Sequence, residues 1–339
     1  MLMSPGEGLQ KIPVRNLQVG MYVIMPVSWK SHPFLIGRFR ISSPAQIQKI
    51  RDAGLEEVMV DPARSSVPCL ASAVPPAGSR RPETQPEKKD AGAVVATLKD
   101  AVKEAAEDRT LPREEKAKVV YSRAVEMIDS VLEQPDRQNI KTSKEAIAAV
   151  VDMILADRDT SHYLARITSH DFYTYTHSVN VGFLAVCLAK TILQDSDNHN
   201  MHELGAGFFL HDLGKVRIGP EIINKPGRLS GEEMAEVRKH PAMGFKILNE
   251  CRQLTEECRT IVLQHHERND GSGYPHQLRG QEIHIYGRIC SIADVYDALT
   301  SDRPYRKRMQ PFEALRLMKD DMMHHFQKDL FEKFVLMLS

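Results

Sequence analysis

The feature that most constrains the fold is the spacing of apolar residues in the second part of the chain. Beyond Lys141, apolar side chains recur every three or four positions through Ile147–Ile154, Val179–Leu193 and Met201–Leu210. This spacing places them on one face of an α-helix, whereas a half-buried strand would need alternation. No stretch there alternates over more than a few residues. We therefore predict that residues 141–339 form an all-α bundle.

The first part of the chain has a different character. Met21–Val27 and Glu57–Asp61 read as strands, and a helix is expected from Pro44 to near Gly54, with Ser43 as its N-cap. The fold class is therefore mainly α, with a small α+β domain in front. We predict an α+β N-terminal domain at 10–64, a Pro- and Ser-rich linker at 65–90, a helical connector at 91–140 and the helical bundle at 141–339. The connector could pack on the bundle or form the seam of a homodimer.

Composition excludes several classes of protein. Lys plus Arg and Asp plus Glu number 45 each, so neither a nucleic-acid polymer nor anionic lipid is an expected partner. The apolar run Val181–Ala189 falls far short of the ~20 residues of a membrane-spanning helix. The first residues show no secretory signal pattern. Five cysteines without a CxxC pair indicate a reducing compartment. We expect a cytoplasmic protein with no membrane insertion.

Histidine is unevenly distributed along the chain. Of 14 histidines, 13 lie at or after His162, so imidazole chemistry belongs to the bundle. A single helical histidine is more often structural than a ligand, and His199, His202, His324 and His325 are interpreted as structural. Imidazole together with carboxylate suits iron, manganese or zinc. The candidate metal ligands are His177, His211, Asp212, His240, His265, His266 and Asp294.

The adjacent pair His211-Asp212 is the most informative of these. A carboxylate has two oxygens, so Asp212 could bridge two cations about 4 Å apart, as two-metal hydrolases require. Lys215 follows His211 by four residues, which would place both on one helix face. Its ammonium group beside the metals would neutralise a phosphate oxygen.

Several short motifs carry a resemblance to a known family. Residues 211–215 read HDLGK, residues 265–267 read HHE and residues 270–275 read DGSGYP. In this order and spacing they resemble the HD-GYP family, a branch of the HD-domain metal-dependent phosphohydrolases. The match extends over about residues 141–339 and includes His177-Ser178, Lys225-Pro226-Gly227, His240, Asp294–Leu299 and Arg303–Arg306. Val19–Val23 is similar to a small domain of unknown role often found ahead of HD-GYP domains.

This resemblance implies an enzyme. Members of the family are phosphodiesterases that hydrolyse cyclic di-GMP to linear pGpG, to GMP or to both. They use a hydroxide that a cluster of metal ions activates. Iron or manganese is the expected metal, with zinc and nickel as alternatives. Expected partners are cyclic di-GMP, a second copy of the chain and diguanylate-cyclase-domain proteins.

The resemblance also implies roles for individual residues. His177, His211, Asp212 and Asp294 would hold one metal, with Asp212 as the bridge to a second held by His240, His265 and His266. The catalytic residues would be Asp212 and Lys215. Lys215, Arg303 and Arg306 match residues that contact substrate phosphates, and Gly273, Tyr274 and Pro275 would shape a loop on the substrate side.

The chain departs from the family pattern at two places. Some members carry a glutamate one helical turn before the first motif histidine, where it helps to bind a third metal. Tyr173 stands there in this chain, so two metals are expected. Phe326-Gln327-Lys328 replaces a Phe-Asp-Pro sequence and loses a helix cap.

Two other functions stay open at this point. The first is a catalytically weak module that senses a cyclic dinucleotide or docks to other proteins, although such a module has no need for seven ligands. The second is a phosphodiesterase acting on another cyclic dinucleotide, because no motif identifies residues that read the bases.

Overall fold

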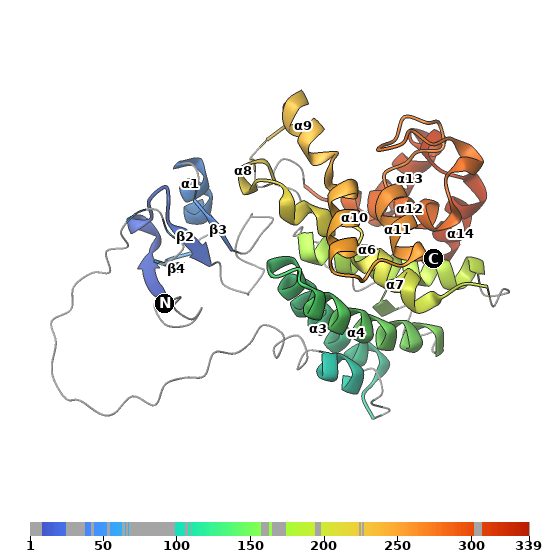
Figure 1. Cartoon of the computed structure of the whole chain (residues 1–339), viewed down its shortest axis with the longest axis horizontal. Coiled ribbons are helices and arrows are strands. Elements are labelled where there is room, and N and C mark those ends of the chain that lie inside the picture. Colours follow the sequence, from blue (N-terminus) through green and yellow to red (C-terminus); the bar gives the residue numbers. More distant parts are fainter. Residues whose placement is uncertain are drawn as a thin grey trace. The chain divides into compact units, whose positions relative to one another are not determined.

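The chain folds into two compact units, residues 1–90 and 91–339 (Figure 1). The computed structural model describes residues 9–24, 38–41, 44–52, 55–62, 65, 67, 99–105, 108, 110–156, 163–164, 174–193, 198–223, 225, 227–301 and 307–338. Almost all of the expected linker at 65–90 lies outside these residues.

The N-terminal unit is built on a four-stranded antiparallel sheet with strand order β1-β4-β2-β3. Its elements are β1 (Gln10–Pro13), η1 (Val14–Asn16), β2 (Tyr22–Ile24), β3 (Arg38–Arg40), α1 (Pro44–Asp52) and β4 (Glu57–Asp61). Val58 and Val60 alternate along β4 and pair with Ile12 and Val23, and all four side chains are buried. These residues and Ile50 of α1 form a small separate core.

The small α+β domain agrees with the sequence prediction in type. The predicted helix at Pro44 and the strand Glu57–Asp61 are present, and β2 lies within the predicted Met21–Val27. The sequence pattern missed β1 and β3. They are four and three residues long, too short to show an alternating pattern by themselves.

The second unit is helical throughout its described residues. Its longer elements are α3 (Arg113–Glu133), α4 (Arg137–Ala156), α6 (Thr174–Leu193), α7 (Met201–Phe209), α10 (His240–Glu250), α11 (Glu256–Gln264), α12 (Ile285–Thr300), α13 (Pro311–Asp320) and α14 (Lys328–Leu338). Shorter elements are η2 (Leu213–Arg217), α8 (Pro220–Ile223), α9 (Gly231–Val237), η3 (Gly280–Glu282) and η4 (Met323–His325). The predicted all-α bundle is confirmed.

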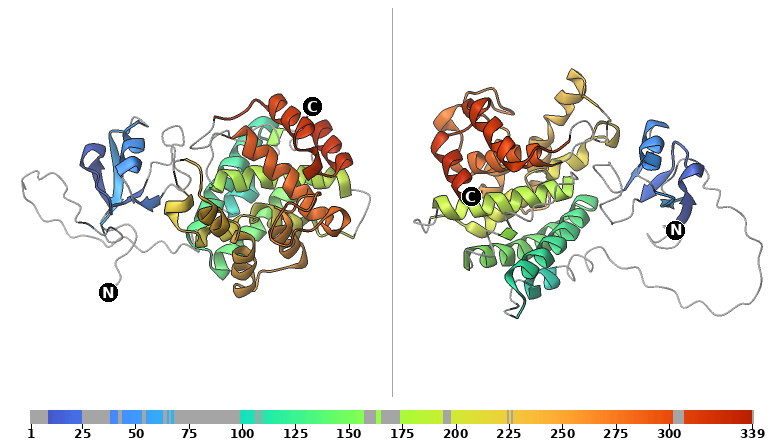
Figure 2. Two further views of the ribbon diagram at one scale, coloured as in Figure 1. Left: turned by 90° about the horizontal axis from the view of Figure 1, so that it is seen from above. Right: turned by 180° about the vertical axis from the view of Figure 1, so that it is seen from behind.

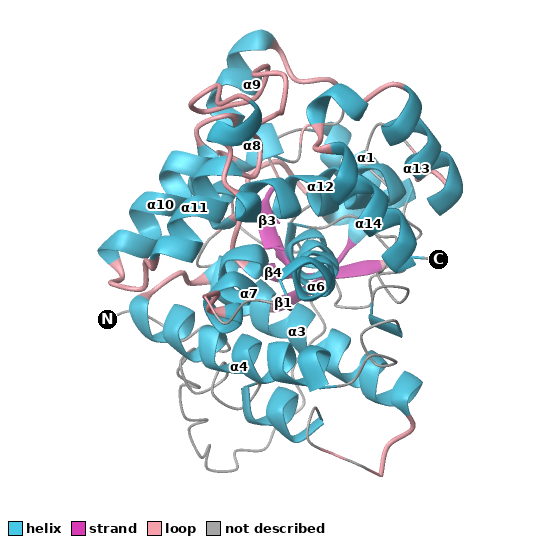
Figure 3. Ribbon diagram, turned by 90° about the vertical axis from the view of Figure 1, so that its right-hand side faces the viewer, coloured by secondary structure: helices cyan, strands magenta, loops and turns pink. Residues whose placement is uncertain are grey.

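Helix α6 is the centre of the bundle. Seen end-on, it is surrounded by α3, α7, α12 and α14, each of which packs against it (Figure 3). Among the described helices it alone is long and apolar enough to cross a membrane, but 83% of its window Thr176–Leu193 is buried in the protein. Its apolar character is therefore that of a core helix.

The expected connector is part of this bundle. Val120, Ala124 and Met127 of α3 are fully buried in the same core as Phe183 of α6, and the Tyr121 ring stacks on Phe183 at 5.9 Å. Helix α3 also packs on α4, and the two lie side by side (Figure 2). Helix α4 runs through residue 141, where the sequence placed a boundary.

At Gly214 the 3-10 helix η2 lies very close to the backbone of α10. A Cβ atom there would lie 1.9 Å from the His240 carbonyl oxygen and 2.5 Å from the Gly244 nitrogen. Both contacts are to backbone, which cannot move aside as a side chain can. Glycine at this position therefore allows η2 to lie against the start of α10.

Gly214→Ala is expected to lower the free energy of unfolding by about 3 kcal/mol, the upper end of the usual overpacking penalty. Thermal denaturation followed by circular dichroism measures it. Gly231→Ala is the matched control, because no atom lies within 4 Å of the added methyl group. Equal midpoints for the two variants would contradict the close approach.

Candidate metal centre

Five elements bring the predicted ligands together at the middle of the bundle. His177 comes from α6, His211-Asp212 follows α7, and His240 is the first residue of α10. His265-His266 follows α11, and Asp294 lies in α12. All are buried except His266, which is half-buried.

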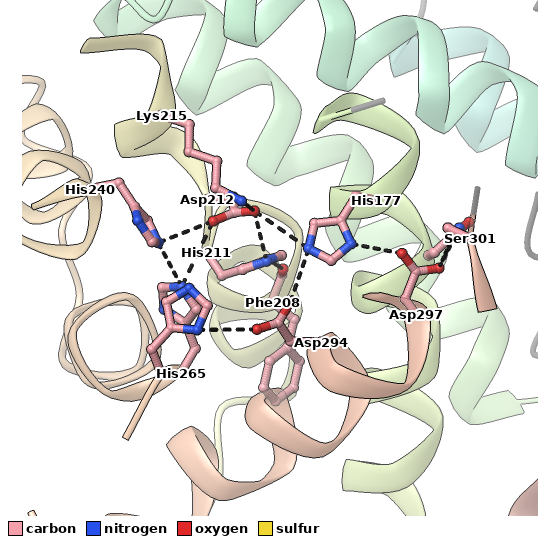
Figure 4. A network of polar contacts seen from close by, with 12 residues as sticks. His177, Phe208, His211, Asp212, Lys215, His240, His265, Asp294, Asp297 and Ser301 are labelled. Atoms are coloured by element: carbon pink, nitrogen blue, oxygen red, sulfur yellow. Dashed lines mark hydrogen bonds and ion pairs between the residues drawn. The ribbon is translucent and has the colours of Figure 1, made fainter. Parts of the chain in front are cut away.

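Asp212 lies between two groups of imidazoles (Figure 4). One group is His177, His211 and Asp212; the other is Asp212, His240, His265 and His266, with ligand atoms within 4.8 Å of one another in each. Asp212 Oδ2 lies 3.5 Å from His177 Nε2 and 3.4 Å from His211 Nε2. Its Oδ1 lies 3.2 Å from His240 Nε2. The two oxygens therefore face different groups, as a bridging carboxylate would.

Asp294 also lies between the two groups. Its Oδ1 is 3.0 Å from His177 Nε2, and its Oδ2 is 3.3 Å from His266 Nδ1. The resemblance assigned Asp294 to the first metal only. The structure places the second oxygen of Asp294 beside His266, which was expected to bind the second metal.

The ends of three helices orient three of the imidazoles. His211 Nδ1 lies 2.8 Å from the Phe208 carbonyl of α7, and His265 Nδ1 lies 2.9 Å from the Val262 carbonyl of α11. His240 Nδ1 lies 2.7 Å from the Val237 carbonyl at the end of α9. The last carbonyls of a helix lack intrahelical donors, so they accept the Nδ1–H. This tautomer leaves each Nε2 with a lone pair facing the cluster.

These residues fit a divalent metal centre. His211 Nε2 and Asp212 Oδ1 are buried and have no hydrogen-bond partner within the described part of the chain. Buried polar atoms are normally paired, and atoms without a partner indicate a place where an ion or a water binds. Imidazole nitrogen with carboxylate oxygen is a donor set for iron, manganese or zinc. The residues of this cluster can therefore hold a metal ion.

Comparison with known proteins places the chain in a family. Residues 149–330 match a family model described as an HD domain, and residues 9–145 match a domain of unknown function. A cyclic di-GMP phosphodiesterase of Pseudomonas aeruginosa is 34% identical over 332 residues, which are 96% of this chain and 76% of that protein. The chain belongs to the HD-GYP family.

Two further relatives show how far the similarity extends. A 3′3′-cGAMP-specific phosphodiesterase of Vibrio cholerae is 42% identical over 124 residues, which cover 36% of this chain but only 24% of that protein. A solved HD-GYP protein of Bdellovibrio bacteriovorus superposes with a TM-score of 0.63 over 97% of this chain and 99% of its own, at 18% identity. This structural likeness supports the shared fold.

Burial and neighbouring charges set the protonation states of the HD-GYP cluster in the absence of metal. Burial opposes ionisation of Asp212, but the ammonium group of Lys215 outweighs it and holds the pKa of the carboxyl well below its ordinary value. Burial lowers the pKa of His240 to about 4 and lowers the pKa of His211 and of His266. These three imidazoles are therefore neutral and able to ligate at neutral pH.

His177 behaves differently from the other ligands. Burial opposes its protonation, but hydrogen bonds to Asp294 and Asp297 outweigh burial and raise its pKa to about 9. In metal-free protein at neutral pH it is an imidazolium. A metal ion must displace that proton.

Lys215 contacts the proposed bridge rather than the neighbouring histidine. Its Nζ lies 2.5 Å from Asp212 Oδ2, and its side chain is 18% exposed, so it joins the buried cluster while keeping some contact with solvent. The prediction of one continuous helix face through His211 and Lys215 is wrong. The chain turns after α7 and continues as the 3-10 helix η2.

The DGSGYP loop packs on the second group. The Tyr274 ring lies 4.6 Å from the His266 ring and 6.3 Å from the His240 ring. Asp270 Oδ1 accepts the Ser272 N–H at 2.9 Å, as expected for a turn. Gly271 has φ +81°, which favours glycine. Gly273 is constrained by a close approach, because a Cβ there would lie 2.4 Å from the Arg268 backbone nitrogen.

Sequence reasoning missed two buried carboxylates. Glu267 is 1% exposed and accepts the backbone N–H groups of His276 at 2.6 Å and Leu278 at 3.0 Å, which holds the chain after the DGSGYP loop. Asp297 accepts from His177 Nδ1 at 2.7 Å. Its position three residues after Asp294 on one helix was the available signal.

Three residues of the sequence analysis, Arg303, Arg306 and Tyr173, are outside the described residues. His199 Nδ1 lies 2.7 Å from the Tyr286 hydroxyl and His202 pairs with Asp152, which agrees with structural roles. His324 and His325 form a third, largely exposed group with Asp270.

Metal uptake at pH 7.5 is expected to release about one proton, because a metal displaces a proton from His177, whereas His211, His240 and His266 are already neutral. Because the pKa of His177 is raised to about 9, the release should vanish as the pH rises through that value, and apparent affinity should rise with pH up to it. Manganese calorimetry in buffers of different ionisation enthalpy counts the protons. His199→Gln should leave the count unchanged, and a count independent of pH would refute the assignment to His177.

Proposed function

We propose that this chain is a metal-dependent phosphodiesterase that hydrolyses cyclic di-GMP to linear pGpG, GMP or both. The observation that carries the proposal is the position of Asp212, whose two oxygens face two imidazole groups in a buried site. The similarity to a cyclic di-GMP phosphodiesterase over 96% of the chain supports the substrate.

Two divalent ions, iron or manganese, would be held by the seven ligands. One would take His177, His211, Asp212 and Asp294, and the other Asp212, His240, His265 and His266. When bound, such ions polarise the phosphate and lower the pKa of water, which supplies a nucleophile at neutral pH. Zinc and nickel suit the same donors, and absence of a glutamate at Tyr173 favours two ions over three.

Lys215 is proposed to bind the scissile phosphate. Its ammonium group contacts Asp212 and its side chain is partly exposed, so it can meet negative charge that develops on phosphoryl oxygens. Arg303 and Arg306 are proposed to bind the same phosphates through their guanidinium groups. Tyr274, with Gly273 and Pro275, is proposed to form the wall of the substrate site beside His266.

A second candidate substrate is 3′3′-cGAMP. The relative named for that substrate is 42% identical to 124 residues of this chain. The two cyclic dinucleotides differ in one base and share the phosphodiester linkages, so the same metal centre could act on either. Side-by-side hydrolysis of both compounds decides between them.

The decisive experiment begins with anaerobic purification in the presence of iron or manganese. Metals are counted per chain, and the products of both cyclic dinucleotides are separated by chromatography. The proposal is supported by about two metal ions per chain, the number that two-metal hydrolases need, together with a linear dinucleotide or mononucleotide product. Bound metal without product points to a sensing or docking module. If the chain binds no metal and yields no product, the proposal of an enzyme is refuted.

Asp212→Ala is expected to abolish turnover and lower the metal count, because it removes both oxygens that face the two groups. Asp152→Ala is the matched control: its carboxylate is 65% exposed and pairs with His202 outside the site. Retention of metals by the Asp212 variant would show that the bridge is assigned wrongly.

Lys215→Met is expected to lower kcat/KM by about 100- to 1,000-fold, the usual effect of losing one group that stabilises transition-state charge. The metal count should stay at the wild-type value, since Lys215 is not a ligand. Lys239→Met removes an exposed lysine paired with Glu236 and should match wild type.

Arg303→Ala should raise KM and leave the number of metal ions per chain close to the wild-type value, because Arg303 is proposed to bind phosphate and not metal. Steady-state kinetics and metal counting measure the two quantities.

The proposal also covers cellular location, oligomeric state and protein partners. A cytoplasmic location is supported by balanced charge and by the four described cysteines, which are all free. A homodimer and association with diguanylate-cyclase-domain proteins stay predictions from the family resemblance. Gel filtration with light scattering tests the first of them.

A further inference from the structure

A chain of buried side-chain hydrogen bonds leads from α3 to the ligand His177. The Tyr121 hydroxyl donates to Asn180 Oδ1 at 2.7 Å, and Asn180 Nδ2 donates to Asp297 Oδ1 at 2.6 Å. His177 Nδ1 donates to Asp297 Oδ2 at 2.7 Å. Exposure of these four residues ranges from 0% to 8%. We call this chain the Tyr121 relay; Figure 4 shows its last link.

The direction of each link follows from the chemistry of the groups. A carboxylate only accepts, so Asn180 must turn its amide nitrogen towards Asp297 and its oxygen towards Tyr121. The tyrosine hydroxyl must then act as donor. Ser301 Oγ donates to the same Asp297 oxygen at 3.2 Å, which further fixes that carboxylate. The carboxylate in turn holds the Nδ1–H of His177, so that Nε2 faces Asp212 and Asp294.

The group that orients His177 is of a different kind from those that orient the other histidine ligands. His211, His240 and His265 are held by carbonyls only three residues away in sequence. His177 is held by a side chain 120 residues away, on a different helix. Its orientation therefore depends on how α3, α6 and α12 are packed together.

The start of the relay lies outside the catalytic domain as the family models delimit it. The HD-domain match covers residues 149–330, whereas Tyr121 lies in the match to the domain of unknown function, residues 9–145. The relay is thus a physical connection from one matched region into the metal centre of the other.

We propose that Tyr121, Asn180 and Asp297 are positioning residues for His177, and that through them the metal affinity of the site depends on the placement of α3. This inference rests on the proposed metal centre. A buried partner of a ligating imidazole fixes its orientation and raises its basicity, and losing one commonly weakens metal binding 10- to 100-fold.

The test compares Tyr121→Phe with Tyr286→Phe. Both substitutions remove a hydroxyl that makes a 2.7 Å hydrogen bond to a side chain, but the partner of Tyr286 is His199, outside the cluster. Manganese affinity is measured by competition with a chelator at 25 °C, together with the thermal midpoint of the metal-free chain. The downfield NMR signal of the His177 Nδ1–H, assigned with His177→Gln, reports the hydrogen bond without metal.

Tyr121→Phe is expected to weaken manganese binding about threefold to tenfold, the size of one net hydrogen bond. It should also shift the Nδ1–H signal, whereas Tyr286→Phe changes neither. Asp297→Asn is a second variant of equal volume. Its amide nitrogen would face a donor on Asn180 or on His177, so one link breaks and affinity should fall about 10- to 100-fold.

A Tyr121→Phe chain with a lower thermal midpoint but wild-type affinity and Nδ1–H signal would overturn the inference, since Tyr121 would then be structural only. Failure of the proposed function looks different. The phosphodiesterase would be refuted, and the relay supported, if the wild-type protein binds manganese but hydrolyses no cyclic dinucleotide while Tyr121→Phe weakens manganese binding.

Discussion

Two carboxylates, Asp212 and Asp294, are buried in the middle of an apolar helical bundle. Moving an unpaired carboxylate from water into such surroundings is strongly unfavourable, so the rest of the fold must supply compensating groups. It does so with five imidazoles and the ammonium group of Lys215, which arrive from separate elements. The arrangement of α6, α7, α10, α11 and α12 is the arrangement that brings these partners to one place.

Helix ends do much of this work. Five of the ligands either begin or follow a helix, and the last carbonyls of α7, α9 and α11 hold the Nδ1 atoms of three of them. The free carbonyls that every helix leaves at its end therefore become the means of setting a histidine tautomer. Gly214 adds to this by letting η2 lie against the backbone of α10, which brings Asp212 and His240 within reach of each other.

Much of this could be predicted from the sequence, and the limits have physical causes. Apolar residues at three- and four-residue spacing in Val179–Leu193 and Met201–Leu210 were enough to predict helices, although α6 is buried on all sides over most of its length. The ligands were found because HDLGK, HHE and DGSGYP occur in one chain in the order and spacing of a known family, a combination that is rare by chance. β1 and β3 were missed because such short strands show no period, and the break after α7 because 3-10 and α-helical residues look alike in sequence. Tyr121 and Asn180 could not be linked to Asp297, since contacts across 59 and 117 residues depend on tertiary packing.

The two family matches meet between residues 145 and 149, yet helix α4 runs unbroken from Arg137 to Ala156. The segment inherited as a module and the segment that folds as one body are therefore not the same. A fusion or deletion cut at the meeting point would split α4 and strip the buried side of α3 from the core. Recombination that preserves folding must cut upstream, near the limit between the two compact units at residue 90. A catalytic domain exchanged between proteins of this kind would then take α3 and α4 with it, and Tyr121 among them.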